Sequence, residues 1–223
     1  IFYIGQAGSL LSEGIEKAGL GDENKKNQQI IIGYYPAWKS YTGFTPERID
    51  ISKLTHVNYA FANISRDYEI EMGYPDKDPE NFKKFKDLKK INPDLKVLIS
   101  VGGWDWSDKF SDMAATEEGR AKFADSCVEF IVKYGLDGVD LDWEYPVGGG
   151  MKTNSNRPED KENFTLLLKE LREKLNAQEL KDNKDYLLTI AAGASNYYIN
   201  NTEVQKFHIY LDYVNLMTYD IHG

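Results

Sequence analysis

The residues best suited to chemistry lie in one short acidic segment, residues 137–146 (DGVDLDWEYP). Asp140, Asp142 and Glu144 alternate there with apolar residues, which is the pattern of a β-strand. Alternate side chains of a strand point to the same face, and their Cα atoms lie about 6.6 Å apart. The segment therefore predicts three carboxyl groups on one face of a strand that Pro146 ends.

Three carboxyl groups on a buried face are costly unless they are paired or used. An ion-pair network is disfavoured, because the predicted strands contain almost no basic residues. A metal site is one alternative, since hard cations prefer clustered carboxylates. General acid catalysis is the other, because like charges so close titrate as a unit and one carboxyl keeps a proton that it can deliver to a leaving oxygen. The spacing alone leaves these two alternatives open.

Aromatic residues at the ends of the predicted strands favour a carbohydrate ligand. They are Tyr34, Trp38, Phe61, Trp104, Trp143, Tyr145 and Tyr219. If they meet at one edge of a sheet, they surround the acidic centre with flat rings that can stack on sugars. A phosphorylated substrate held through a metal would instead require Lys and Arg. We therefore expect a sugar-binding acidic site that uses no metal and no cofactor.

The segments that must position these residues alternate between two periodicities. Near-continuous apolar runs predict buried strands at residues 30–38, 54–64, 95–104, 135–144, 187–195 and 213–220. Amphipathic segments predict helices at residues 79–91, 110–134 and 158–180. A strand and a helix repeated six times indicate an α/β protein with a parallel sheet.

Two parallel-sheet architectures fit six such units. A doubly wound sheet usually carries a glycine-rich phosphate turn after its first strand, and residues 35–41 (YPAWKSY) are no such turn. The units average about 32 residues, so two more would approach the ~250 residues of a (β/α)8 TIM barrel. We predict that barrel, with about its first six βα units present. The barrel domain would span residues 30–223, incomplete at its C-terminus, after a leader or linker at residues 1–29.

The composition excludes several classes of partner. The 223 residues include 27 Lys and Arg against 36 Asp and Glu, and this net charge of −9 would repel nucleic acid. No apolar run is long enough for a membrane span. The single cysteine, Cys127, lies in an apolar helical stretch and is expected to be buried and inert. The three histidines, His56, His208 and His222, lack the spacing of zinc ligands. We also expect the protein to be a monomer.

At the acidic segment and several strand ends the chain resembles the chitinases of glycoside hydrolase family 18. Residues 137–144 match that family's D-x-x-D-x-D-x-E signature, and residues 100–103 match its S-x-G-G motif. Residues 33–38 (GYYPAW), 58–61 (NYAF) and 217–220 (MTYD) match further strand ends. The resemblance runs from about residue 30 to residue 223. It implies the barrel fold and a secreted enzyme, since chitin cannot enter a cell.

The resemblance also implies a mechanism: retaining hydrolysis of β-1,4-linked N-acetylglucosamine in chitin or chito-oligosaccharides, with the substrate's own acetamido oxygen as nucleophile. Glu144 would be the general acid and base. Asp142 would hold the acetamido N–H, and Asp140 would share a proton with Asp142. Tyr219 would hydrogen-bond to the acetamido carbonyl and orient it.

The same resemblance assigns the remaining site residues to substrate binding. Tyr34, Phe61 and Met217 would line the pocket of the reacting sugar, and Trp104 would stack on a neighbouring ring. Tyr145 would contact substrate at the rim, and Asp220 would contact the distorted sugar. Asp137 and Ser100 would support the site from beneath.

Other functions stay open beside a chitinase. A non-hydrolytic, lectin-like chitin-binding protein of the same fold is disfavoured by the presence of Glu144 together with both aspartates. An endo-β-N-acetylglucosaminidase would differ in the loops of its cleft. A Mg²⁺-dependent hydrolase using the carboxyl cluster is the alternative from another class, and EDTA would inhibit it.

Overall fold

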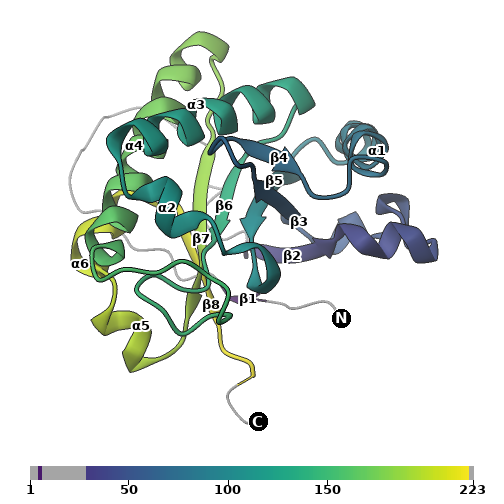
Figure 1. Cartoon of the computed structure of the whole chain (residues 1–223). Coiled ribbons are helices and arrows are strands. Elements are labelled where there is room, and N and C mark those ends of the chain that lie inside the picture. Colours follow the sequence, from purple (N-terminus) through teal and green to yellow (C-terminus); the bar gives the residue numbers. More distant parts are fainter. Residues whose placement is uncertain (1–4, 7–28, 221–223) are drawn as a thin grey trace.

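The centre of the computed structural model, which describes residues 5–6 and 29–220, is a single sheet (Figure 1). Its strand order is β1-β2-β3-β5-β6-β7-β8, with β4 paired to β3. The six parallel strands are β2 (Ile31–Pro36), β3 (His56–Ile64), β5 (Lys96–Gly102), β6 (Gly138–Asp142), β7 (Leu187–Gly193) and β8 (Tyr213–Met217). They confirm the α/β class and the six predicted strands, which together form an open part of a barrel.

Two short strands flank this parallel sheet. β1 (Gly5–Gln6) pairs antiparallel with β2, and β4 (Ile70–Met72) pairs antiparallel with β3. The remainder of the segment predicted as a leader or linker, residues 1–4 and 7–28, lies outside the described residues.

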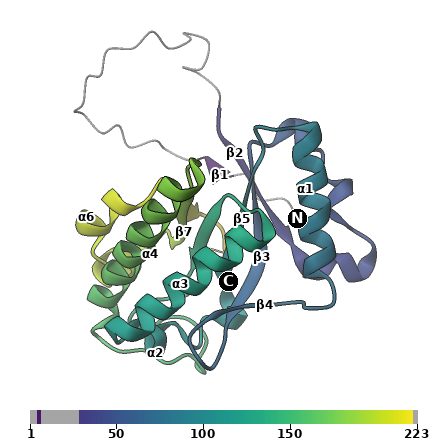
Figure 2. The ribbon, with the colours of Figure 1, turned by 90° about the horizontal axis from the view of Figure 1, so that it is seen from above.

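Helices cover the outer face of the sheet. The long ones are α1 (Asp78–Ile91), α3 (Glu117–Tyr134) and α4 (Asp160–Asp182). Figure 2 shows α3 and α4 side by side along one flank, with α1 on the other. The short ones are α2 (Phe110–Ala114), α5 (Asn196–Asn200) and α6 (Val204–Phe207). Among the helices described, none combines the length and the apolar character needed to cross a membrane.

The helices differ from the predictions in two places. The single helix predicted at 110–134 is two helices, because the Thr116 side chain accepts the N–H of Gly119 at 3.0 Å and starts α3 as its N-cap. The strict strand–helix alternation is wrong between β2 and β3. Only 3₁₀ turns connect them, and Gly43, with φ 78°, ends the first of these turns.

The hydrophobic core lies between the sheet and the helices. From α3 it takes Phe123, Cys127 and Ile131, and from α4 it takes Leu167, Leu168, Leu171 and Leu175. Cys127 is buried as predicted, and burial raises the pKa of its thiol well above the usual value. The predicted amphipathic spacing therefore identifies the buried faces of both helices.

Trp143 belongs to this core, and its predicted place in the aromatic collar is wrong. Its ring stacks on Phe110 at 5.2 Å and meets the edge of Phe164 at 5.5 Å, and only 2% of the residue is exposed. The reason is the alternation of the strand. The residues on either side of Trp143 point to the inner face of the sheet. The Trp143 side chain therefore points to the outer face, where the helices pack.

The register of the parallel strands brings polar residues into one row. Asp140 on β6 lies opposite Ser100 on β5 and Thr189 on β7, and Asp142 lies opposite Gly102. Two strands further along the sheet, Tyr34 on β2 lies opposite Asn58 on β3. Asp142 and Gly102 are the pair nearest the carboxyl ends of the strands, which lie at the lower side of the view in Figure 1.

Candidate active site

The three acidic residues predicted to share a face lie at the carboxyl end of β6. Asp140 and Asp142 are within the strand, and Glu144 lies two residues beyond its end. All three are buried, with exposed fractions of 0%, 5% and 9%. Exposure therefore increases toward the end of the strand, and the three carboxyl groups differ in their hydrogen-bond partners.

The carboxyl group of Asp140 is saturated with hydrogen bonds. Oδ2 accepts from the hydroxyls of Tyr34 at 2.8 Å and Ser100 at 2.7 Å. Oδ1 accepts from Thr189 Oγ1 at 2.5 Å and Asn215 Nδ2 at 3.2 Å. Burial raises the pKa of Asp140, while these donors act in the opposite direction. Four partners from β2, β5, β7 and β8 hold this side chain in one orientation.

Asp142 is buried with an unused acceptor. Its Oδ1 makes no hydrogen bond with any of the described residues, which is costly in an interior. Burial, and then the negative charges of Glu144 and Asp140, raise the pKa of Asp142 well above its usual range. The unpartnered oxygen makes Asp142 available to a donor that the described residues do not supply.

Glu144 has the electrostatics of a general acid. Burial raises the pKa of its carboxyl group, and the charges of Asp105 and Asp220 raise it further, against a hydrogen bond from the Tyr145 side chain that lowers it. Asp105 follows the end of β5 and Asp220 follows the end of β8, so two other strand ends contribute. A raised pKa favours the protonated form of the carboxyl group, which can donate its proton to a leaving group.

Two side chains hold the peptide groups on either side of Glu144. The N–H of Glu144 donates to Ser107 Oγ at 2.9 Å, and its C=O accepts from Asn154 Nδ2 at 3.0 Å. A Cβ at Gly150 would lie 1.8 Å from the Glu144 carbonyl oxygen, so only glycine allows this loop to pass so closely. The backbone at Glu144 is therefore enclosed by protein.

The opposite end of β6 carries a paired carboxylate. Asp137, just before the strand, forms ion pairs with Lys89 at 2.6 Å and Lys184 at 3.0 Å, and it accepts the Val97 N–H at 2.8 Å. Burial acts to raise the pKa of Asp137, but these lysines and hydrogen bonds hold it below the usual value. Asp137 fits the predicted supporting role beneath the site.

The predicted aromatic collar is partly assembled. Tyr34 is half-buried and donates to Asp140, and burial with the charges of Asp140 and Asp142 raises its pKa well above the usual value, so it stays a neutral donor. Trp38 stacks on Phe61 at 6.3 Å and an interplanar angle of 19°. Trp104, in a turn after β5, is 50% exposed.

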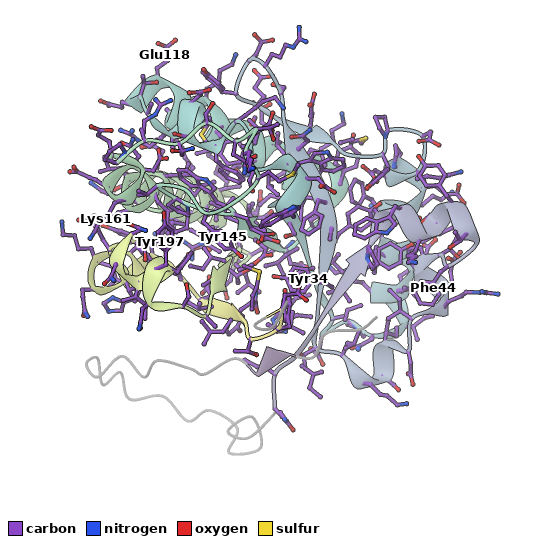
Figure 3. The ribbon with its side chains drawn as sticks, turned by 60° about the horizontal axis from the view of Figure 1, so that its bottom comes forward. Tyr34, Phe44, Glu118, Tyr145, Lys161 and Tyr197 are labelled. Atoms are coloured by element: carbon purple, nitrogen blue, oxygen red, sulfur yellow. The ribbon has the colours of Figure 1, made fainter. Side chains whose placement is uncertain are left out.

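Further rings extend the same edge toward β7. Tyr145 packs edge-on against Tyr198 at 6.1 Å, and burial raises the pKa of the Tyr145 hydroxyl. Figure 3 looks onto this edge and shows Tyr34, Tyr145 and Tyr197 on it. Tyr197 is half exposed and borders the glycine loop, since a Cβ at Gly149 would lie 3.2 Å from its ring.

The last predicted residues follow or end β8. Met217 is the final residue of the strand and is partly buried, whereas Tyr219 and Asp220 lie beyond it and are exposed. Asp220 is near enough to Glu144 to raise its pKa, and Tyr219 is near enough to Tyr145 to affect that hydroxyl. The ends of β2, β3, β5, β6 and β8 thus contribute all ten predicted site residues to one edge.

Sequence reasoning missed four residues of the site. Thr189 and Asn215 bind Asp140, while Ser107 and Asn154 bind the backbone of Glu144. Thr189 and Asn215 were visible only as polar residues inside apolar strands, which is a usable signal. Ser107 and Asn154 are loop residues whose types give no hint of their partners.

The carboxyl groups do not converge as a metal centre. Among the residues that the structure describes, no group of three or more His, Cys, Asp or Glu side chains could hold a metal ion. Successive carboxyl groups instead lie along β6, and Asp140 already accepts four hydrogen bonds. The arrangement is suited to proton transfer.

Comparisons with known proteins agree with this arrangement. Residues 30–223 match the model of glycosyl hydrolases family 18. Chitinase A1 of Niallia circulans is 44% identical over 86% of this chain and 34% of its own length. Chitotriosidase-1 of Mus musculus is 35% identical over 86% of this chain and 42% of its own length. The chain thus spans between a third and a half of the length of these two curated relatives.

Solved structures show the same similarity. Chitinase ChiA74 from Bacillus thuringiensis has a TM-score of 0.84 at 41% identity, covering 86% of this chain and 40% of its own. A family 18 N-acetylglucosaminidase from Paenibacillus barengoltzii has a TM-score of 0.76 at 45% identity, covering 86% and 54%. With the fold, the acidic strand and these matches in agreement, the chain belongs to glycosyl hydrolases family 18.

Proposed function

We propose that this chain carries the acid–base centre of a chitinase, which hydrolyses β-1,4-N-acetylglucosamine linkages by a retaining, substrate-assisted mechanism. The observation that carries the proposal is the difference between neighbouring carboxyl groups on one strand end. Asp140 accepts from four donors, whereas Asp142 keeps a buried oxygen without a partner among residues 5–6 and 29–220, and Glu144 has a raised pKa. Several relatives are named chitinases, which supports the substrate class.

In the first step Glu144 acts as general acid. Its proton moves to the glycosidic oxygen, and the bond from that oxygen to the anomeric carbon breaks with its electron pair going to the oxygen. The substrate's acetamido carbonyl oxygen forms a bond to the anomeric carbon from the opposite face. Asp142 accepts the acetamido N–H on its free Oδ1 and stabilises the positive charge of the cyclic intermediate.

In the second step the Glu144 carboxylate acts as general base. It takes a proton from a water molecule, whose oxygen attacks the anomeric carbon on the face that the leaving group vacated. The bond to the acetamido oxygen breaks and its electron pair returns to the amide. Two inversions leave the anomeric configuration unchanged, and Glu144 has its proton back.

The role proposed for Asp140 is sharpened by its partners. For Asp142 to turn and share a proton with Asp140, one of the four donors on Asp140 would have to give way. The long contact from Asn215 at 3.2 Å is the weakest of the four and is the partner expected to yield. Asp140 then serves mainly as a rigidly held carboxyl group beneath Asp142.

The surrounding residues would bind the sugar chain. Tyr34, Phe61 and Met217 would line the pocket of the reacting sugar, and the hydrogen bond from Tyr34 to Asp140 supports this for Tyr34. Trp104 and Tyr145 offer ring faces to neighbouring sugars. The residues after β8, Tyr219 and Asp220, would contact the acetamido carbonyl and the distorted ring. A location outside the cell follows from the insoluble polymer substrate.

The test is product analysis with chitotetraose and cellotetraose, using the protein at its natural length beside its Glu144→Gln variant. We expect chitobiose from the first substrate, nothing from the second, and no product from the variant. Cleavage of cellotetraose would contradict participation of the acetamido group. Binding of chitotetraose without cleavage by the unmodified protein would indicate a lectin-like role, and inhibition by EDTA would indicate a metal-dependent hydrolase.

A further inference from the structure

The end of the β5–β6 ladder has an unusual construction. The last backbone pair is Gly102 with Asp142, after which the Gly103 N–H still donates to the Asp142 carbonyl at 2.8 Å. The φ angles of Gly102 and Gly103 are 102° and 77°, and the chain then turns away from β6. The next donor of β6, the N–H of Glu144, therefore has no backbone acceptor from β5.

The side chain of Ser107 replaces that missing acceptor. Its Oγ accepts the Glu144 N–H at 2.9 Å and donates to the Gly103 carbonyl at 2.8 Å, with the Asp142 carbonyl at 3.2 Å. Ser107 is fully buried, so water does not compete for these bonds. One hydroxyl thus extends the sheet by one hydrogen bond at the position of Glu144.

A second side chain holds the other side of the same residue. Asn154 donates to the Glu144 carbonyl at 3.0 Å from the loop that precedes α4. That loop is itself anchored: Ser155 Oγ donates to Asp112 on α2 at 2.9 Å, and Arg157 forms an ion pair with Asp112. The two polar backbone groups of Glu144 are therefore both satisfied by side chains from separate elements.

From this we infer that Ser107 is a positioning residue for the reaction, because its hydroxyl fixes the peptide of Glu144 and so sets where the carboxyl group meets the glycosidic oxygen. The inference rests on the proposed role of Glu144 as acid and base. Asn154 acts in the same way from the other side, with a weaker effect because it lies in a less buried loop. A displacement of the acid by about 1 Å is enough to lower turnover by ~100-fold.

The test compares variants of the protein at its natural length on chitotetraose. For Ser107→Ala we expect kcat to fall ~10- to 100-fold with KM nearly unchanged. Once Glu144 is released from this anchor, we expect its carboxyl group to become better solvated, and weaker desolvation lowers its pKa. The alkaline limb of kcat/KM should therefore move to lower pH. Ser107→Thr, which keeps a hydroxyl, should restore both kcat and the limb.

A matched control separates positioning from general stability. Ser126 on α3 makes the same two kinds of bond, accepting the Ile70 N–H at 3.0 Å and donating to the Phe123 carbonyl at 2.8 Å. Ser126→Ala should lower thermal stability, as Ser107→Ala does, but leave the pH profile unchanged. If Ser107→Ala does not fold, Asn154→Ala should still show a lower kcat and an alkaline limb moved to lower pH, both by less than is expected for Ser107→Ala.

The outcomes distinguish the inference from the function beneath it. Full activity of Glu144→Gln would contradict the proposed function and the inference together. An inactive Glu144→Gln beside Ser107→Ala and Asn154→Ala variants with unchanged kcat and pH limb would contradict the inference alone. A pH limb that moves equally in Ser126→Ala would also overturn it, because the shift would then come from loosening of the whole domain.

Discussion

The two ends of β6 carry the same kind of side chain and use it in opposite ways. At the amino end Asp137 is paired with Lys89 and Lys184, and its pKa is held below the usual value. At the carboxyl end Asp142 and Glu144 have raised pKa values, and among the described residues neither forms an ion pair. The first end stabilises the fold, whereas the second bears the cost of burying carboxyl groups without ion pairs, as functional sites commonly do.

The difference comes from what the connections place at each edge. Lys89 lies in the last turn of α1 and Lys184 follows the end of α4, so helix C-termini bring cations to the amino edge of the sheet. The carboxyl edge receives loops with aromatic and acidic residues, including Trp104, Asp105 and Asp220. A carboxyl group at this edge has the negatively charged Asp105 and Asp220 as neighbours, and like charges favour its protonated form.

The largest test of this contrast is Glu144→Gln at the carboxyl end. Hydrolysis should fall by ~10²- to 10⁴-fold, because proton transfer is lost. The midpoint of urea unfolding should stay the same or rise, because a neutral amide replaces a carboxyl group that is costly to ionise in the interior. Glu118→Gln, at an exposed position in the first turn of α3, is the control for the substitution itself. A loss of stability in Glu144→Gln would show that this end is also structural.

The reverse result is expected for Asp137→Asn at the amino end. Removing the charge leaves two lysines without their carboxylate and should lower the free energy of unfolding by about 2 kcal/mol, less than for a fully buried pair because both lysines are partly exposed. Turnover per folded molecule should be unchanged. Asp87→Asn on α1 removes an exposed ion pair with Lys90 and should cost far less stability than Asp137→Asn. Equal losses in the two variants would contradict the importance of burial at Asp137.

The pH dependence of stability should differ in sign at the two ends. The folded-state pKa of Asp137 is lowered, so its contribution is present above the unfolded value of about 3.9 and is lost as pH falls through the folded pKa. The folded-state pKa of Asp142 is raised, so stability is lost as pH rises from about 3.9 to that folded pKa. The melting temperature of Asp142→Asn minus that of the unmodified protein should therefore increase as pH increases. A constant difference across pH would contradict the raised pKa of Asp142.

The smallest effect is expected from Lys184→Met. Lys89 continues to pair with Asp137, and Lys184 is partly exposed, so the loss should be about 0.5–1 kcal/mol. Lys89→Met should cost more, since the 2.6 Å contact of Lys89 is shorter and its side chain is more buried. Urea unfolding of the two variants checks this order, and a reversed order would mean that Lys184 dominates the pairing.

The sequence predicted the elements of the fold more reliably than their boundaries. All six parallel strands and the buried faces of α3 and α4 follow from apolar patterns that local chain geometry enforces. The break at Thr116 was not predicted, because the apolar spacing continues across it. The prediction for Trp143 is wrong because its aromatic type favours the collar, whereas its alternation with the acidic residues turns its side chain toward the helices.

The sequence by itself determined that Asp140, Asp142 and Glu144 share a face near the end of a strand, because side chains alternate along any β-strand. Only the tertiary structure decided their different states. Asp140 is saturated with hydrogen bonds because the strand register brings Ser100 and Thr189 beside it, while Asp142 receives no donor at Oδ1 from the part of the chain that the structure describes. Ser107 reaches the Glu144 N–H because β5 turns away at Gly103. Contacts between residues far apart in the chain depend on packing, which no local pattern encodes.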